Sequence, residues 1–309
     1  MKKLLLILFI ITGILACASQ ERNRKPLPKT KAELGKLLFF EPIISLDSSV
    51  SCSSCHIPSH LFADTSAFSK GVGGKLGHRN TPSVTNMASR SIFFWDGRAT
   101  SLEEQSLDPI RDPIEMNLAV IEAVKRLQQN KFYQEAFFNI YQSSEIDSNM
   151  LGEVLAAFEK TLETTFTPFD KFMDGDITAI SVSAMRGQII FNEKGNCFDC
   201  HFGPDFTGDE FKNIGLFNAQ HLNDSGRYDV SKNSEDLGKF KVPGLRNVEL
   251  TAPYMHNGMF ETLEEVVEYY NNPDFFVPNH QNRDTLIKPL NLNNQEKQDL
   301  VAFLKTLHN

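Results

Sequence analysis

Two copies of the string C-x-x-C-H, at residues 52–56 and 197–201, constrain this chain more than any other feature. Random placement of 5 cysteines and 8 histidines in 309 residues would produce one such string in about two chains per thousand. Two thiols at this spacing can add to the two vinyl groups of one porphyrin, and the adjacent histidine then becomes the proximal iron ligand. Disulfides, a zinc site or a redox dithiol are alternatives, but none of them requires a histidine directly after the second cysteine. The sequence therefore predicts two covalently bound c-type haems, attached through Cys52, Cys55, Cys197 and Cys200 and ligated by His56 and His201.

The fifth cysteine, Cys17, ends an N-terminal signal. A short basic start is followed by an apolar run over residues 4–15 and by Ala16, which is typical of a bacterial lipoprotein signal. Cleavage before Cys17 would leave its thiol to carry a lipid; ordinary cleavage beside an incidental cysteine is the alternative. We expect a signal peptide over residues 1–16, a polar tether over residues 17–29 and a periplasmic protein anchored to a membrane, because c-type haems are attached outside the cytoplasm.

Composition limits the partners and the number of domains. A length of 309 residues suggests about two domains, and 41% hydrophobic with 23% charged residues are globular values. The net charge of −8 argues against nucleic acid as a partner.

The arrangement around each C-x-x-C-H string is similar. A helix expected from Thr30 to about Phe40 leads into the first string, and one over residues 183–191 leads into the second. Further helices are expected over residues 118–141, 150–164, 263–270 and from about 294 to the end. We predict a mainly α fold of two cytochrome c-like domains, residues 30–175 and 176–309, each with one haem.

The sixth iron position decides what each haem can do. A haem with a strong sixth ligand only passes electrons, whereas an open iron beside an acid–base group can activate peroxide. Near the first string, His60 is too close to His56 to cross the ring, while His78, in a glycine-rich loop over residues 61–81, or Met87 could reach the iron. None of them stands out, which favours an open or weakly closed first haem.

Glu115 is the candidate acid–base residue. It lies between prolines and apolar residues, at 113–116, where burial can raise the pKa of a carboxyl group so that it shuttles a proton. Gln105 could orient peroxide through a hydrogen bond. Taken alone, the sequence favours an ordinary solvated surface residue at both positions.

The order of several short motifs resembles the bacterial dihaem cytochrome c peroxidases, including the MauG-like members, over essentially the whole mature chain. The motifs are the two C-x-x-C-H strings, Arg79-Asn80-Thr81-Pro82, Phe94-Trp95-Asp96-Gly97-Arg98, Glu104-Gln105, Ile114-Glu115-Met116 and residues 245–256. The resemblance implies that Gln105 and Glu115 face peroxide over the first haem and that Trp95 helps to carry electrons between the haems. It also implies a calcium ion near Asn80, Thr251 and Pro253, the last two mainly through backbone carbonyls.

Two departures from the family pattern matter. Where well-known peroxidases have a methionine ligand at the second haem, the matching residue here is Tyr270, the MauG-like choice, and a phenolate should lower the haem potential. The loop histidine that closes the first haem in resting peroxidases has no clear counterpart.

Three functions therefore stay open. The preferred one is a cytochrome-c peroxidase that takes electrons from a small c-type cytochrome, or a similar donor, and reduces hydrogen peroxide. The alternatives are a MauG-like oxidase that modifies a protein side chain and a dihaem electron carrier without enzymatic activity. Dimers are common among proteins of this kind.

Overall fold

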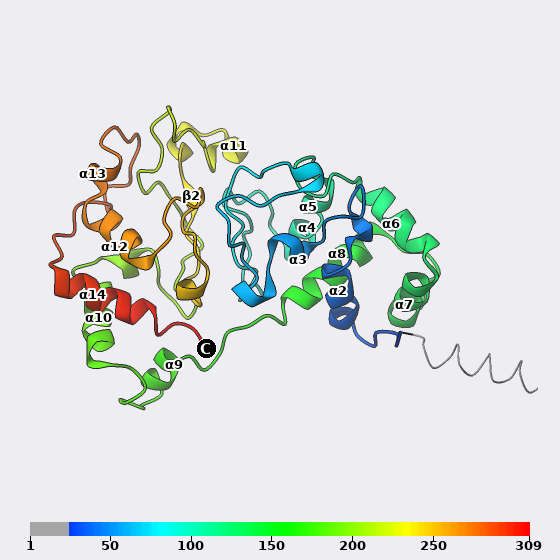
Figure 1. Cartoon of the computed structure of the whole chain (residues 1–309), viewed down its shortest axis with the longest axis horizontal. Helices are drawn as coiled ribbons and strands as arrows, with labels where there is room; N and C mark the ends of the chain where they lie inside the picture. The colour runs from blue at the N-terminus through cyan, green and yellow to red at the C-terminus, as the bar shows by residue number, and fades with distance from the viewer. Residues whose placement is uncertain (1–24) are drawn as a thin grey trace, which may run out of the picture.

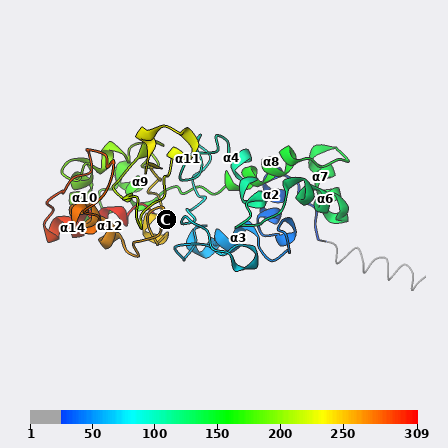
Figure 2. The same ribbon diagram turned by 90° about the horizontal axis from the view of Figure 1, so that it is seen from above.

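The computed structural model describes residues 25–309 and forms two mainly helical halves side by side along the long axis of the molecule (Figures 1 and 2). The predicted signal peptide, Cys17 and most of the tether lie outside these residues. Within them, no helix is both long enough and apolar enough to span a bilayer.

The first half is built from helices that precede and follow the first haem motif. Thr30 begins the first of them, because its side-chain oxygen accepts a hydrogen bond from the backbone N–H of Glu33. The elements are α2 (Lys31–Phe39), η1 (Pro42–Ile44), α3 (Cys52–Cys55), η2 (Pro58–His60), η3 (Val72–Gly74), α4 (Leu102–Gln105), α5 (Asp108–Arg111), α6 (Val120–Gln129), α7 (Lys131–Tyr141) and α8 (Ser148–Glu159).

The structure contains two helices where the sequence predicted one. The expected helix over residues 118–141 is broken at Asn130, which ends α6 and begins α7. The Asn130 side chain accepts hydrogen bonds from the N–H groups of Phe132 and Tyr133, so it caps a new helix instead of continuing the old one. The apolar periodicity alone did not reveal this break.

The second half repeats the plan with longer loops. Its elements are α9 (Pro168–Met173), α10 (Val182–Asn192), η4 (Cys197–Asp199), β1 (Phe211–Lys212), α11 (Tyr228–Ser231), η5 (Ser234–Asp236), β2 (Phe240–Lys241), η6 (Val248–Leu250), α12 (Leu263–Asn271), α13 (Pro273–Phe276) and α14 (Asn294–Leu304). The strands β1 and β2 pair antiparallel, with Phe211 opposite Lys241. The predicted boundary at residue 175 stays a prediction; α9, just before it, packs Phe169 against Phe303 of α14 with ring centroids 5.2 Å apart.

Each half crosses its first and last long helices at a glycine. A Cβ atom on Gly35 of α2 would lie 1.7 Å from the Val154 carbonyl oxygen of α8, and one on Gly187 of α10 would lie 1.9 Å from the Asp299 carbonyl oxygen of α14. Only glycine permits backbones to approach so closely. The same contact in both halves shows that the internal repeat is one of architecture.

Candidate active site

Both C-x-x-C-H strings form short helical turns that hold their cysteines part-buried. In the first, Ser51 and Ser54 cap the turn reciprocally, and the Ser51 N–H donates to the Ser54 hydroxyl over 3.0 Å. The cysteines at 52, 55, 197 and 200 are all free thiols. Burial, as the main cause, raises the pKa of Cys55 to about 11 and that of Cys197 to about 12, so these thiols are neutral at ordinary pH.

The two motif histidines are oriented identically. The Nδ1 atom of His56 lies 2.9 Å from the Phe62 carbonyl oxygen, and that of His201 lies 2.9 Å from the Phe206 carbonyl oxygen. Because a carbonyl can only accept, Nδ1 carries the hydrogen in both rings, and Nε2 is free to bind a metal. Burial lowers the pKa of both rings and favours the neutral imidazole that iron requires.

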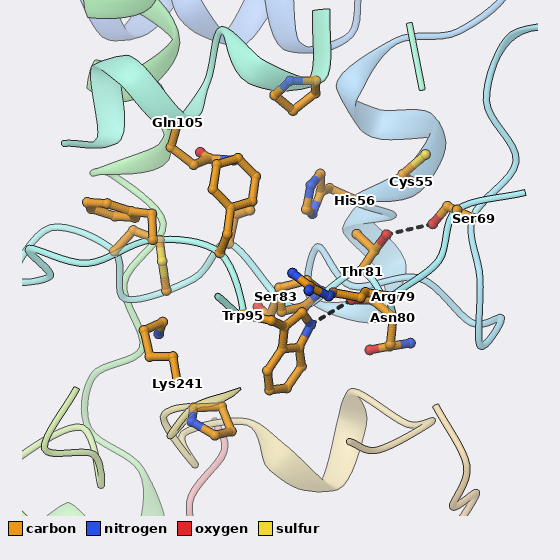
Figure 3. Close-up of a pocket in the computed structure, with 18 of the residues that line it drawn as sticks. Cys55, His56, Ser69, Arg79, Asn80, Thr81, Ser83, Trp95, Gln105 and Lys241 are labelled. Carbon is orange, nitrogen blue, oxygen red and sulfur yellow. Dashed lines mark hydrogen bonds between the residues drawn. The ribbon is translucent and has the colours of Figure 1, made fainter. Parts of the chain in front are cut away.

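A cavity of about 820 Å³ extends from the first motif to the interface between the halves (Figure 3). Its walls include His56, Gln105 and Glu115 from the first half and Lys241 from the second. Figure 3 shows Gln105 and His56 on opposite sides of the open space. This volume is near the upper end of the range for pockets that enclose a small molecule or cofactor.

Polar groups in this cavity lack the partners that burial requires. The Oε1 atom of Gln105 is buried without a hydrogen bond. Glu115 lines the same cavity and is partly buried. A buried polar group is costly unless it is bonded, so Gln105 fits a site in which a bound molecule completes its contacts. Together with the orientation of His56, these residues fit a haem.

The position of Glu115 depends on a tight turn and on a glycine. The Glu115 N–H donates to the Asp112 carbonyl oxygen over 3.1 Å, and the Glu115 carbonyl oxygen accepts from Val72 N–H over 2.8 Å. A Cβ atom on Gly71 would lie 2.0 Å from the Ile114 carbonyl oxygen, so only glycine lets the 61–81 loop pack on this turn. The glycine-rich loop was predicted from the sequence, but the close packing of Gly71 on the turn that holds Glu115 was not.

Electrostatics make Glu115 a group that titrates near neutrality. Burial, as the first cause, and the Asp112 charge, as the second, raise its pKa to about 7, against the opposing effect of Arg98. A carboxyl group with this pKa can both accept and donate a proton near pH 7. Asp112 and Arg98 were not identified from the sequence as tuning residues.

Trp95 joins the two halves. Its indole N–H donates to the Asn80 carbonyl oxygen over 2.8 Å, and its own carbonyl oxygen accepts from Lys241 N–H over 2.7 Å. The ring of His256, buried in the interface, lies edge-on to the indole with centroids 6.5 Å apart and stacks on Phe240 at 3.6 Å. Trp95 therefore lies at the interface between the two halves, and its role in electron transfer stays a prediction.

The residues predicted around calcium line one cavity. Asn80, Thr251 and Pro253 are all in its wall, and the Asn80 N–H donates to the His256 carbonyl oxygen over 2.7 Å. No group of three or more His, Cys, Asp or Glu side chains able to hold a metal occurs among residues 25–309. The predicted ligands are instead an amide and backbone carbonyls, and calcium stays a prediction.

Tyr270 lies on α12. Burial is the main cause that raises its pKa, and Tyr269, Cys197 and Cys200 add smaller effects in the same direction. Tyr269, by contrast, is fully buried and donates to the Ile214 carbonyl oxygen over 2.5 Å. The Tyr270 hydroxyl has no hydrogen-bond partner in the described part of the chain, so of the two tyrosines it is the one available to a haem.

The candidate sixth ligands of the first haem also reach the cavity. His78 and Met87 both line it, but His60 does not, and its Nε2 lies 2.6 Å from the Ala252 carbonyl oxygen in the second half. The sixth ligand therefore stays a prediction.

A buried carboxylate of the cavity wall, Glu159 at the end of α8, was not predicted. It is 4% exposed, its Oε2 has no partner, and burial alone raises its pKa to about 8. Glu159 lines the cavity and lies on the buried face of α8 with Leu155 and Phe158. A glutamate on an apolar helix face was the sequence feature from which its burial could have been predicted.

Comparison with known proteins identifies the family. The model of the di-haem cytochrome c peroxidase family matches residues 29–178, and that of cytochrome c matches residues 184–308. The chain is 39% identical over 288 residues to the methylamine utilization protein MauG of Methylorubrum extorquens, covering 91% of this chain and 79% of that one. It is 37% identical over 278 residues to the cytochrome c551 peroxidase of Nitrosomonas europaea, with 89% and 79% covered.

Solved structures agree. A MauG-like protein associated with microbial copper homeostasis superposes with a TM-score of 0.82 at 30% identity, covering 91% of this chain and 90% of the other. The dihaem peroxidase BthA of Burkholderia thailandensis superposes with a TM-score of 0.79 at 25% identity, with 92% and 86% covered. The chain belongs to the dihaem cytochrome c peroxidase family, which includes MauG-like members. Its two cytochrome c-type domains imply two c-type haems, and the predicted fold class is confirmed.

Proposed function

We propose that this protein reduces hydrogen peroxide to water with electrons from a small c-type cytochrome. The observation that carries the proposal is the pairing of Glu115, whose pKa is about 7, with the unpartnered Gln105 Oε1 in the cavity that contains His56. In the reaction, peroxide takes up two electrons and two protons, the O–O bond breaks, and two waters form. The haems, when bound through the two motifs, supply the one-electron redox chemistry.

Glu115 moves the proton that breaking the O–O bond requires. Its carboxylate accepts a proton from one peroxide oxygen and returns it to the other oxygen, which then leaves as water. Gln105 holds the peroxide in place, because its free Oε1 accepts a hydrogen bond from a peroxide O–H. Asp112 and Arg98 set the pKa at which Glu115 changes its state.

Electrons reach the peroxide site from the second half. We infer that the donor docks on the half that carries Cys197, Cys200 and His201, and that Trp95 lies on the route between the haems. Two hydrogen bonds support this role: the indole N–H of Trp95 is fixed on the Asn80 carbonyl oxygen, and the Trp95 backbone carbonyl accepts from Lys241 N–H of the second half.

Several further features belong to the proposal. We infer a periplasmic protein anchored by a lipid on Cys17, supported by the signal-like N-terminal sequence. We also propose calcium at Asn80, Thr251 and Pro253, supported by their shared place in the cavity wall. A homodimer is proposed from the resemblance to the family alone.

Steady-state kinetics test the activity. Oxidation of reduced cytochrome c should depend on peroxide, and Glu115→Gln should slow it by about a hundredfold or more. Glu122→Gln is the control, because Glu122 is an exposed α6 residue paired with Lys125. Equal peroxide-dependent rates in Glu115→Gln and the control would refute the role of Glu115, and the absence of any peroxide-dependent oxidation in the native protein would leave the electron-carrier function as the better account.

A second candidate function is oxidation of a protein side chain, as in a MauG-like enzyme. Tyr270 favours it, because it stands where the family resemblance places a ligand of the second haem, and a phenolate ligand would stabilise the ferric state of that haem. The two enzymatic functions differ in one observation. If reduced cytochrome c does not discharge the peroxide-treated protein, whereas a side chain of a partner protein becomes oxidised, the side-chain oxidase is correct.

A further inference from the structure

Arg90 and Lys241 are two nearly buried cations that face the cavity from opposite halves of the molecule. Arg90 belongs to the loop that follows Pro82, and Lys241 belongs to β2; their side chains are 7% and 14% exposed. Both line the 820 Å³ cavity, and Figure 3 shows Lys241 among its walls with Gln105, Trp95 and His56.

Neither cation has the contacts that its burial requires. Arg90 lies 3.4 Å from Asp205 and 3.5 Å from Asp209, and its Nε is buried without a partner. Lys241 lies 3.6 Å from the same Asp209 oxygen that faces Arg90. These distances exceed those of ordinary N–H···O hydrogen bonds, which are about 2.7–3.2 Å. Arginine has five N–H donors and lysine has three, and charged donors in a protein interior are normally bonded.

A neighbouring arginine shows what a completed site looks like here. Arg246 also lines the cavity, but it donates two parallel hydrogen bonds of 2.9 Å to Asp170. Arg90, in contrast, packs beside Gly244, where a Cβ atom would be 2.9 Å from its Nη2 atom. The absence of a side chain at Gly244 therefore leaves room for the Arg90 guanidinium.

The chemistry of a c-type haem indicates what completes the contacts. Its vinyl edge is held by the motif thiols, and the opposite edge carries two propionate carboxylates. Cys52 and Cys55 lie in the first half, while the cavity continues to the interface at Arg90 and Lys241. Arg90 and Lys241 would therefore be available to hold the carboxylates of a haem attached at these thiols, since guanidinium and ammonium groups are the usual partners of carboxylates.

We propose that Arg90 and Lys241 form the propionate-binding site of the first haem and so join both halves of the protein through that cofactor. The Asp209 carboxylate faces both cations, so its negative charge reduces the repulsion between Arg90 and Lys241. The site raises the potential of the first haem, because positive charge at the propionates favours the ferrous state. This inference does not depend on peroxidase activity, so the two can fail separately.

The test uses the holoprotein with Arg90→Gln and Lys241→Gln. Spectroelectrochemical titration should show a lower midpoint potential of the first haem in each variant. The equilibrium constant for its reduction should fall about tenfold, which is about 59 mV for one electron. The potential of the first haem should also become more dependent on pH, since a propionate that has lost its cation takes up a proton more readily. Lys125→Gln, at an exposed α6 cation, should leave both potentials unchanged.

Resonance Raman spectroscopy distinguishes binding from long-range electrostatics. The propionate bending mode should shift in both variants, and Arg90→Lys should restore part of the potential but not the bidentate contact. If Arg90→Gln does not fold, Lys241→Gln and Arg90→Lys carry the same test. Unchanged potentials would overturn the proposal, and so would a changed potential with an unmoved bending mode.

Discussion

The pKa of Glu115 provides the most specific prediction, because two neighbouring charges shift it in opposite directions. After burial, the negative charge of Asp112 is the largest cause that raises the pKa of Glu115, and the positive charge of Arg98 lowers it. Asp112→Asn removes one negative charge but keeps the side-chain oxygen that accepts a hydrogen bond from Ile114 N–H over 2.9 Å. The turn should therefore survive while the electrostatics change.

The expected magnitude follows from the titration of one group. Removing the Asp112 charge should lower the pKa of Glu115 from about 7 by about one unit. The carboxylate fraction one unit below the original pKa then rises from about one tenth to one half, so the peroxide reaction at that pH should be about fivefold faster. Well above the original pKa, both proteins are almost fully ionised and should react at the same rate.

The assay is the second-order rate constant for peroxide across the pH range, measured by stopped-flow absorbance. The rate should rise with pH through about 7 in the native protein, because the carboxylate is the form that accepts the proton. Asp112→Asn should move this rise to lower pH, and Arg98→Gln should move it to higher pH. A rate increase that moves to higher pH in Asp112→Asn would refute the reasoning, and so would an unchanged pH dependence of the rate in Glu115→Gln.

Three further predictions concern other parts of the account. Gly71→Ala should cost about 1–3 kcal/mol of unfolding free energy and slow the peroxide reaction, because its Cβ meets the Ile114 carbonyl oxygen, whereas Gly77→Ala, whose nearest neighbour is 3.7 Å away, should be silent in thermal unfolding and kinetics. Tyr270→Met should raise the midpoint potential of the second haem in a spectroelectrochemical titration, and an unchanged potential would show that Tyr270 does not bind that iron. Arg246 lowers the pKa of Asp170 from 3.8 to about 2, so this pair stabilises the protein above about pH 4 and loses its effect as the pH falls toward 2. Asp170→Asn should cost about 1–2 kcal/mol in urea unfolding at neutral pH and much less near pH 2, and an equal cost at both would contradict the ion pair.

The features that could be predicted from the sequence are local ones. The attachment motifs are short and chemically defined, and the cap at Thr30 and the start of α14 at Asn294 follow from neighbouring residues. The break at Asn130 was missed because its cap interrupts an otherwise continuous apolar stripe. The local pattern made Glu115 and Gln105 candidates only, and the family resemblance was needed to prefer them over ordinary surface residues.

The features that could not be predicted depend on contacts between distant segments. Arg90 meets Asp209 only when the two halves pack together, and Lys241 meets Trp95 in the same way. The closeness of Gly71 to Ile114 depends on how a loop folds back, and no periodicity records it. Glu159 shares a stripe with core residues, so its burial without a partner is visible only in three dimensions.

The most direct test of the central claim is a single-turnover measurement. The holoprotein, with its haems ferric or half reduced, is mixed with hydrogen peroxide and then with reduced cytochrome c, while haem absorbance is followed. The account predicts a fast haem absorbance change that Glu115→Gln slows by about a hundredfold, followed by oxidation of two cytochromes per peroxide. An absorbance change that is equally fast in Glu115→Gln, or no change in either redox state, would contradict the assignment of Glu115 and the cavity at His56 as the site of peroxide reduction.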